Sequence, residues 1–349
     1  MLCPFWFWNG KLNPTELVDQ LKKIHDNGIT QVIPQPREGI EEYRTPKYFD
    51  TFAQVTSVAK SEGMKFVIYD DFNWPSGSAG GKISEKYPAM TIRPNLTKTK
   101  SRFTLPYSWD NYSDTMDPKA AREFTWLTHE RYKQIVGEHF KKTITGFFMD
   151  EPGMYANFLG MEKGGMPWTD GLPQRHKELH EGNEFFDDLR KMQGLRTANN
   201  MRAGIRVMTT AGKLHTEGIL DTVRKWTNSH GLKLYGHLIG EETPLELVKT
   251  QGNPYDAIMK FDVPGFDVIG AYDPAKMRLA SALPRATGKD YFCEAFGAFG
   301  NGLTLETMVQ MTKDISETGT NTLVPHALFQ SLKGGRKHDS MPEDRKSVV

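Results

Sequence analysis

Cysteine is scarce in this chain of 349 residues, which holds only Cys3 and Cys293. Two cysteines so far apart predict buried free thiols and exclude a fold that depends on a disulfide framework. No run of about 18 apolar residues is present, so we expect no membrane-spanning helix. The first ten residues, MLCPFWFWNG, lack the basic region and the long apolar run of a signal peptide. Charge of neither sign dominates, because 44 Lys and Arg balance 43 Asp and Glu, and this balance argues against a nucleic-acid partner.

Several catalytic motifs are also missing. No Gly-x-Gly-x-x-Gly loop follows an early strand pattern, which argues against a doubly wound nucleotide-binding fold. No Gly-x-Ser-x-Gly elbow is present, which argues against a serine hydrolase. His176 and His180 have the spacing of metal ligands on a helix but lack the glutamate of a metalloprotease, so we interpret them as a solvated helix face.

Apolar segments of strand length alternate with helical patterns along the chain. The predicted strands are Pro4–Trp8, Gln31–Pro34, Lys65–Asp71, Thr143–Asp150, Leu232–Leu238, Asp267–Gly270, Asp290–Ala295 and Asn321–His326. The predicted helices are one that Asn13 caps and Pro14 begins, followed by Phe52–Glu62, Phe124–Phe140, Ile219–His230 and Leu305–Glu317. Eight strands that alternate with helices predict an α/β fold of the (β/α)8 TIM-barrel type.

Two longer segments interrupt this alternation, Lys82–Ala121 after the third strand and Tyr155–Leu195 after the fourth. The first is polar with β-prone pieces, and we expect it to form a hairpin. Both follow the C-terminal end of a strand, so we expect both to cover the catalytic face. The barrel is predicted to span residues 1–332. The basic tail, residues 333–349, lacks apolar periodicity and is predicted to be disordered.

The segment Ile144–Gly153 carries the strongest functional pattern. Its sequence, ITGFFMDEPG, is a mostly apolar run that delivers Asp150 and Glu151 before a Pro-Gly pair ends the strand. Parallel barrel strands bring their C-terminal residues to the active-site face, so we expect the two carboxylates at that rim. Placing charge there costs free energy that a surface pair would avoid, which favours a functional role over a solvated strand end.

Other predicted strands also end in acidic, imidazole or indole side chains, which are Trp6, Trp8, Asp70, Asp71, Trp74, His237, Glu241, Glu242, Glu294 and His326. Two facing carboxylates suit cleavage of a glycosidic bond, in which one protonates the leaving oxygen and the other activates water or attacks the anomeric carbon. Glu151 and Glu294 follow the fourth and seventh strands, roughly opposite each other around the ring. The apolar neighbours of Glu294 are expected to raise its pKa, unless it is a structural partner of an Arg or His.

The remaining groups at this rim are predicted to bind the substrate. Trp6, Trp8 and Trp74 are candidates for stacking on sugar faces, with core packing as the alternative. Asp70 and Asp71 are candidates for binding sugar hydroxyls or a cation, although no EF-hand-like spacing is present.

Four segments resemble the catalytic barrel of glycoside hydrolase family 106, which contains bacterial α-L-rhamnosidases. They are YDDFNWPSGSAGG at Tyr69–Gly81, GFFMDEPG at Gly146–Gly153, CEAFG at Cys293–Gly297 and GTNTLVPHALFQS at Gly319–Ser331. The resemblance extends from about Phe5 to Lys337. It implies a barrel that cleaves a terminal sugar, α-L-rhamnose, from an oligo- or polysaccharide. It also implies calcium in the active site, although the sequence itself requires no cofactor.

Carried over by position, the resemblance makes Glu151 the general acid and Asp150 a supporting group that positions it or touches the sugar. The second carboxylate is Glu294 by analogy with clan A glycosidases, or else Glu241 or Glu242 after the fifth strand. Clan A enzymes retain the anomeric configuration, whereas the family analogy implies inversion, so both outcomes stay open. His237 and His326 are expected to contact the substrate.

Two alternative functions stay open at this point. One is a sugar-binding barrel without activity, and the other is a different clan A enzyme, such as a β-galactosidase-like one.

Family members normally continue into β-rich domains, so residues 333–349 are alternatively the junction to such a domain. The resemblance implies a periplasmic or secreted protein if the chain is a fragment, and a cytoplasmic one otherwise. The oligomeric state is not indicated.

Overall fold

A parallel sheet forms the centre of the molecule in this computed structural model, which describes residues 1–92, 94–96, 101–103, 107–154, 165–241, 243–299 and 302–331. Nine strands pair in parallel in the order β13-β12-β11-β10-β8-β3-β2-β1-β14. They are β1 (Phe5–Trp8), β2 (Gln31–Pro36), β3 (Lys65–Tyr69), β8 (Ile144–Met149), β10 (Lys233–Gly236), β11 (Val263–Val268), β12 (Phe292–Ala295), β13 (Thr322–Pro325) and β14 (Leu328–Phe329).

The two ends of this sheet meet, because β13 and β14 together form the eighth position of a barrel. β13 pairs with β12, β14 pairs with β1, and only His326 and Ala327 separate β13 from β14. The backbone N–H of Cys3 also donates to the carbonyl of Leu323 at 2.9 Å, which joins the chain before β1 to β13. The predicted α/β barrel is therefore confirmed.

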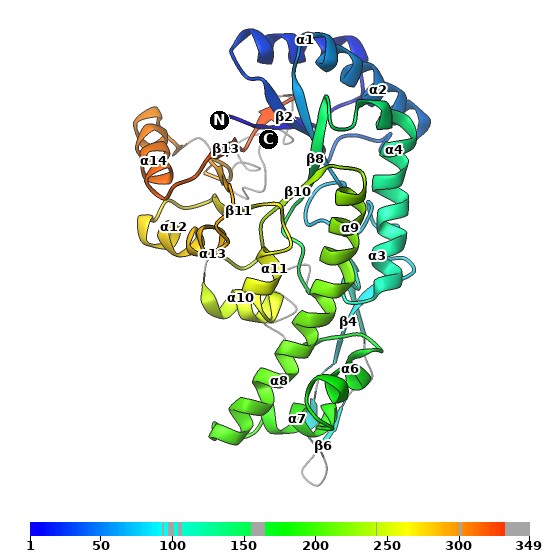
Figure 1. Cartoon of the computed structure of the whole chain (residues 1–349), viewed down its shortest axis with the longest axis vertical. Coiled ribbons are helices and arrows are strands. Elements are labelled where there is room, and N and C mark those ends of the chain that lie inside the picture. Colours follow the sequence, from blue (N-terminus) through cyan, green and yellow to red (C-terminus); the bar gives the residue numbers. More distant parts are fainter. Residues whose placement is uncertain are drawn as a thin grey trace, which may run out of the picture.

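The chain forms helices, most of which cover the outside of the barrel, while those within residues 172–210 extend away from it (Figure 1). The helices are α1 (Pro14–Asp26), α2 (Pro46–Ser61), α3 (Pro118–Thr125), α4 (Arg131–Val136), α6 (Leu172–Leu179), α7 (Phe185–Met192), α8 (Ala198–His215), α9 (Asp221–Ser229), α10 (Pro244–Gln251), α11 (Pro254–Ile258), α12 (Pro274–Ala280), α13 (Ala282–Ala286) and α14 (Leu305–Glu317). Two π-helical turns, η1 (Trp126–Glu130) and η3 (Thr216–Leu220), and a 3-10 turn, η2 (Gly137–His139), continue α3, α8 and α4. The expected cap is present, because Asn13 accepts a hydrogen bond from the N–H of Glu16.

Two elements differ from the sequence-based prediction. The sixth strand, β11, begins at Val263, whereas the prediction placed its beginning at Asp267. The prediction missed the first residues because Pro264 and Gly265 are uncommon inside strands. The helix predicted to begin at Ile219 is the end of a longer helical run that starts at Ala198. Its glycines permit close packing rather than ending the helix. A Cβ atom on Gly212 would lie 2.3 Å from the carbonyl oxygen of Gln251.

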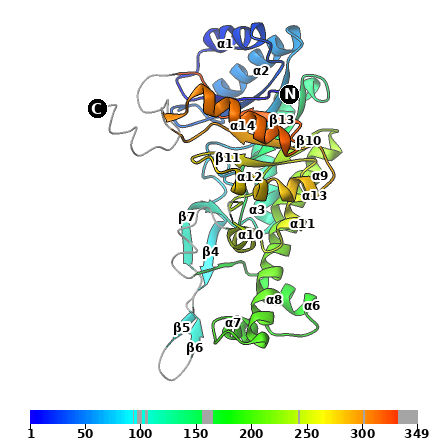
Figure 2. The ribbon, with the colours of Figure 1, turned by 90° about the vertical axis from the view of Figure 1, so that its left-hand side faces the viewer.

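The two predicted insertions are present, and they share one small sheet. The strands of this sheet are β4 (Pro88–Ile92), β7 (Tyr107–Ser113) and β9 (Met166–Trp168), while β5 (Pro94–Leu96) and β6 (Ser101–Phe103) form a separate two-stranded sheet. β4 pairs antiparallel with both β7 and β9, while β5 and β6 form the expected hairpin. The base of this sheet touches the barrel rim, where the hydroxyl of Tyr112 donates to the carbonyl of Ser76 at 2.9 Å. The rest, with α6 and α7, extends away from the barrel instead of covering its face (Figure 2).

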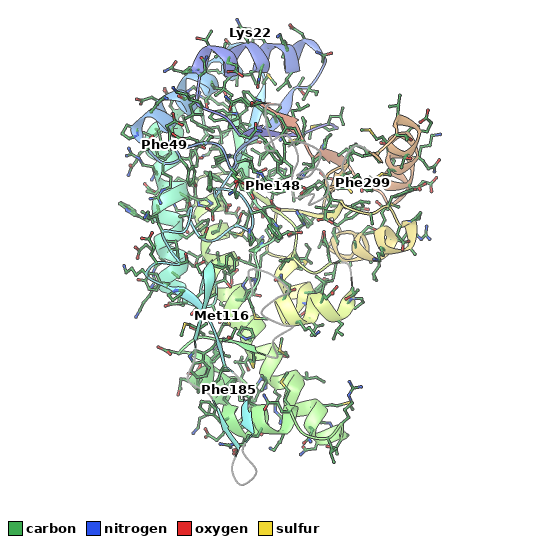
Figure 3. The ribbon with its side chains drawn as sticks, turned by 180° about the vertical axis from the view of Figure 1, so that it is seen from behind. Lys22, Phe49, Met116, Phe148, Phe185 and Phe299 are labelled. Atoms are coloured by element: carbon green, nitrogen blue, oxygen red, sulfur yellow. The ribbon has the colours of Figure 1, made fainter. Side chains whose placement is uncertain are left out.

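Aromatic side chains fill both the interior of the barrel and the layer outside it. Phe5, Phe148 and Phe292 pack inside the barrel, and Phe148 is labelled in Figure 3. Cys3 and Cys293 are buried free thiols, as predicted. Among the described residues, no helix combines the length and the apolar character that crossing a membrane requires. The tail, residues 333–349, lies outside the described residues.

Candidate active site

His237, which follows β10, is the centre of a buried cluster of carboxylates. Its Nε2 lies 3.1 Å from Oδ1 of Asp150 and 3.1 Å from Oε2 of Glu294. Its Nδ1 lies 3.3 Å from Oε1 of Glu241 and 3.8 Å from Oε1 of Glu151. All five side chains are buried. The structure thus brings together residues that follow β8, β10 and β12, as the sequence predicts.

The charge on His237 balances this cluster. Burial alone would lower the pKa of the imidazole, but its contacts with Asp150, Glu241 and Glu294 outweigh burial and raise that pKa well above its usual value. His237 is therefore an imidazolium at neutral pH. A buried cation stabilises the neighbouring anions at short range, so the protein tolerates several carboxylates in one small volume.

Glu151 is held at the end of β8 in a form suited to donating a proton. Burial raises its pKa well above the usual value, the carboxylates of Asp150, Glu241 and Glu294 raise it further, and His237 opposes them. The Nε1–H of Trp74 donates to Oε2 of Glu151. The backbone of Glu151 has a φ of 46°, an uncommon value for a residue with a side chain, and such strain is typical of functional sites.

Glu294 has the opposite character and corrects one prediction. Its Oε1 lies 2.6 Å from Nδ1 of His326, and its Oε2 contacts His237. Burial opposes ionisation of Glu294, but these two histidine contacts outweigh it and lower its pKa to about 2. The apolar neighbours were expected to raise this pKa, and that expectation is wrong because the carboxylate points toward the histidines. Glu294 is therefore an anion across the working pH range.

Asp150 links the cluster to the loop after β3. The hydroxyl of Tyr69 donates to Oδ2 of Asp150 at 2.8 Å. The N–H of Asp150 donates to Oγ of Ser76, and that hydroxyl donates to Oδ1 of Asp70 at 2.7 Å. The other oxygen of Asp70 faces Nε2 of His129 at 3.8 Å, and both side chains have zero exposure. Asp70 therefore supports the rim from beneath. It is not open to a sugar, so the prediction that Asp70 binds substrate is corrected.

Asp71 organises the backbone of the same loop. Its carboxylate accepts hydrogen bonds from the N–H groups of Phe72, Gly77, Ser78, Ala79 and Gly80, at 2.7–3.0 Å. Its side chain is fully buried. A carboxylate surrounded in this way has no free oxygen for a sugar hydroxyl, so the prediction that Asp71 binds substrate is corrected. The loop that it shapes carries Trp74, which faces Glu151.

We expect Asp71→Ala to destabilise the protein by about 2–4 kcal/mol, because several buried N–H groups would lose their acceptor. Urea denaturation of the variant and the wild type measures this difference. Asp50→Ala, at an exposed position of α2, is the matched control and should change stability by less than about 0.5 kcal/mol. An unchanged midpoint for Asp71→Ala would contradict the role of this carboxylate.

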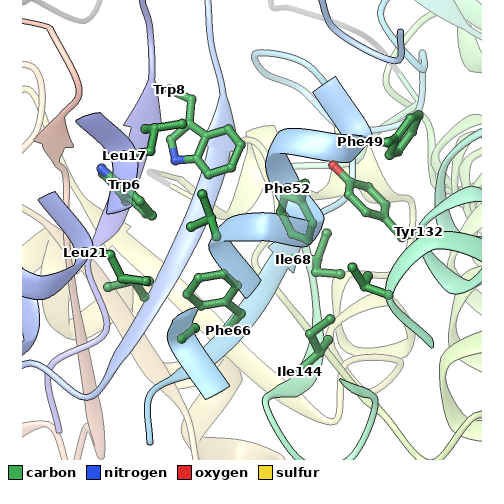
Figure 4. Packing of buried hydrophobic residues seen from close by; sticks show 14 of the residues in the cluster. Trp6, Trp8, Leu17, Leu21, Phe49, Phe52, Phe66, Ile68, Tyr132 and Ile144 are labelled. Carbon is green, nitrogen blue, oxygen red and sulfur yellow. The ribbon is translucent and has the colours of Figure 1, made fainter. Parts of the chain in front are cut away.

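Three tryptophans were predicted to stack on sugars, and the structure separates them. Trp6 and Trp8 are 1% and 0% exposed, and they pack between the barrel and its outer helices, as Figure 4 shows. Neither can reach a sugar ring, so core packing is the correct interpretation. Trp74 is 45% exposed and contacts Glu151, so it stays a candidate. Glu242 lies outside the described residues.

The histidine pair on α6 also differs from its interpretation as a solvated face. His176 has zero exposure, and its Nε2 lies 3.1 Å from Oδ2 of Asp188. Arg206 donates to both oxygens of Asp188, and His176 Nδ1 lies 2.9 Å from Oγ1 of Thr210. These bonds join α6, α7 and α8. The spacing of the two histidines does not indicate that α7 and α8 cover this helix.

Sequence reasoning missed two charged residues of the site. The guanidinium of Arg37, after β2, lies 4.5 Å from the ring centre of Phe7. Burial lowers the pKa of Arg37, and its attraction to Tyr69, Asp150 and Glu294 opposes that change. Asp267 lies in β11, and its N–H donates to Oε1 of Glu241. Arg37 follows β2, and Asp267 lies near the C-terminal end of β11. A charged residue at such a position in a barrel strand is the sequence signal that could have identified both.

The cluster around His237 contains two groups of side chains that lie close enough together to hold a metal ion. Asp150, His237 and Glu294 form one, and Glu151, His237 and Asp267 form the other. Calcium prefers an all-oxygen shell, whereas both groups depend on a nitrogen of His237. The arrangement therefore does not fit calcium.

Comparison with known proteins gives a fold but no family. No protein-family model matches this chain, and no curated protein does either. The chain is similar to the structure of a rhamnosidase from Novosphingobium sp. PP1Y, with a TM-score of 0.66 and 10% identity. This likeness shows the barrel fold alone.

That match covers 94% of this chain but only 55% of the rhamnosidase, so the chain spans about half the length of that protein. An endo-β-1,4-mannanase from Thermotoga petrophila matches less closely, with a TM-score of 0.48, 8% identity, and coverage of 93% of this chain and 67% of that one.

Proposed function

We propose that this protein is a glycoside hydrolase that uses a pair of carboxylates at the C-terminal rim of its barrel. The observation that carries the proposal is the buried cluster around His237, in which Glu151 and Glu294 lie against opposite nitrogens of one imidazole ring. Burial raises the pKa of Glu151, while the contacts with His237 and His326 lower the pKa of Glu294 to about 2. Cleavage of a glycosidic bond needs this combination of a proton donor and an anion.

Glu151 acts as the general acid in this proposal. Its proton passes to the leaving oxygen as the glycosidic bond breaks, and the sugar develops positive charge at its anomeric carbon. Trp74 supports this step in two ways. Its Nε1–H fixes the carboxyl group of Glu151, and its exposed indole face lies beside that group, where a sugar ring can stack.

Glu294 is the second carboxylate, and Glu241 is the alternative. Glu151 and Glu294 contact opposite nitrogens of His237, so the ring lies between them, whereas Glu151 and Glu241 contact the same nitrogen. A wider separation, ~6.5–9.5 Å, leaves room for the water of an inverting enzyme, and ~5–5.5 Å suits a retaining one. Glu241 also accepts the N–H of Asp267, which ties it to β11. These contacts support Glu294 as the base, and with it inversion as the outcome to be tested.

The stereochemical course tests this choice. We expect hydrolysis of an aryl α-L-rhamnoside to release the β anomer first, as followed by proton NMR before mutarotation. Glu294→Gln should slow turnover at least tenfold more than Glu241→Gln, because only Glu294 activates water. Glu138→Gln, at an exposed position, should have no effect. Release of the α anomer together with a larger loss for Glu241→Gln would assign the role to Glu241 and a retaining mechanism.

The substrate proposed is a terminal α-L-rhamnoside of an oligo- or polysaccharide. The resemblance of the rim segments to glycoside hydrolase family 106 and the fold shared with a rhamnosidase support this choice. A panel of aryl glycosides tests it: faster turnover of a β-galactoside would favour the other clan A enzyme instead. A barrel that binds oligosaccharide by calorimetry yet releases no reducing sugar from any panel member would be a binding protein.

A further inference from the structure

The outer wall of the barrel carries a second concave surface, away from the cluster around His237. It is a groove of about 450 Å³ between α3 with η1 on one side and α9 on the other. Figure 1 shows these helices side by side, and they pack against each other along their length. None of the residues that line the groove belongs to the candidate active site.

Two indoles line this groove. Trp126, the first residue of the π-helical turn η1, is 64% exposed, and Trp226 faces the groove from α9. Trp226 is fixed, because its Nε1–H donates to Oε2 of Glu130 at 3.1 Å. The indole of Trp126 is open to a ligand in this groove, and π-helical turns often occur at functional sites.

The charge of the groove is positive. Arg122 and Lys225 line it, and neither forms an ion pair within the part of the chain that the structure describes. The acidic side chains nearby are already neutralised. Glu130 accepts a hydrogen bond from Lys133 at 3.0 Å, and Asp221 pairs with Lys260 at 2.8 Å. Arg122 and Lys225 thus lie beside two indoles, and the carboxylate of Glu130, which also lines the groove, is already paired with Lys133.

We propose that this groove binds a hexuronate residue of an acidic polysaccharide. The apolar C–H face of a pyranose ring stacks on the indole of Trp126, and the carboxylate pairs with Arg122 and Lys225. A neutral sugar would supply the stacking face but leave both cations unpaired. The choice of a saccharide rests on the proposed function. A second site of this kind holds the polymer on the same molecule as the catalytic rim and so raises its local concentration.

Calorimetry with trigalacturonate as the probe tests the site, in the full chain carrying Glu151→Gln so that no turnover interferes. Trp126→Ala should weaken binding at least tenfold, and so should the double change Arg122→Gln with Lys225→Gln. Lys119→Gln removes an exposed cation from the same helix outside the groove and should leave binding unchanged. Added salt should weaken binding to the parent protein more than to the double variant.

Three results would each overturn the proposal. One is equal affinity for trigalacturonate in the parent and in both groove variants. Another is equal affinity of the parent for cellotriose, a neutral trisaccharide. The last is a dimer in sedimentation experiments that Trp126→Ala abolishes, because the groove would then be a contact between copies of this chain. Trp126→Ala in the otherwise wild-type protein should hydrolyse a small aryl glycoside as fast as the wild type does. A failure of this binding site can therefore be distinguished from a failure of the proposed catalysis.

Discussion

Glu151→Gln is expected to reduce the turnover of an aryl α-L-rhamnoside by about 10²–10⁴-fold, because the amide cannot protonate the leaving oxygen. The loss should depend on the leaving group. A dinitrophenyl group departs without a proton, so the variant should retain more activity on that substrate than on a rhamnoside with an alkyl leaving group. Steady-state kcat/KM for both substrates measures the two losses. Equal losses would mean that Glu151 does not act as an acid.

The pH profile gives an independent readout for the same residue. The raised pKa of Glu151 means that the wild type should lose activity as pH rises through that value, because the acid is then ionised. Glu151→Gln should lack this basic limb. The acidic limb, set by Glu294 with its pKa of about 2, should stay where it is. A basic limb unchanged in the variant would assign it to another group.

Folding controls separate chemistry from stability. The neighbouring carboxylates and burial both disfavour the charged form of Glu151, so replacing it with the neutral Gln should leave the melting temperature unchanged or raise it. Glu138→Gln, an exposed position, should match the wild type in both activity and stability. A large loss of activity together with a large drop in melting temperature would be a structural effect and not evidence for acid catalysis.

The barrel could be predicted from the sequence because its signals are local. Strand-length apolar runs such as ITGFFM, and helix signals such as Asn13-Pro14, depend on residues that are close together in the chain. Where the local signal was ambiguous, the prediction was wrong. Pro264 and Gly265 hid the start of β11, and glycines such as Gly212 hid a helix in which they make close contacts.

The ionisation of the site could not be predicted, because it depends on contacts between distant residues. Glu294 has apolar neighbours in sequence, yet its carboxylate meets His237 and His326 from two other strands. Asp71 ends a strand like Asp150 does, but backbone N–H groups of the following loop surround it. Strand order places a residue at the rim, and only the three-dimensional packing decides whether it faces substrate, a partner or the loop beneath.

His237→Gln is expected to cost about 3–5 kcal/mol of folding free energy, because it leaves Asp150, Glu241 and Glu294 buried without their cation. The size of the effect should depend on pH. The folded-state pKa of His237 is raised above its unfolded value of about 6.5, so its contribution is fully present below that value. The contribution is then lost as pH rises through the folded-state pKa. Urea denaturation of both proteins between pH 6 and pH 10 measures the difference.

His25→Gln is the matched control, because His25 is partly exposed and its nearest carboxylate oxygens are 3.9 and 4.0 Å away. It should change stability by less than about 0.5 kcal/mol at every pH. A stability difference for His237→Gln that stays constant from pH 6 to pH 10 would mean that His237 is neutral in the folded protein. The carboxylates would then have to share protons among themselves, and Glu294 would lose the partner that keeps it an anion. Catalysis by an acid and an anion on either side of one ring therefore depends on the charge of His237.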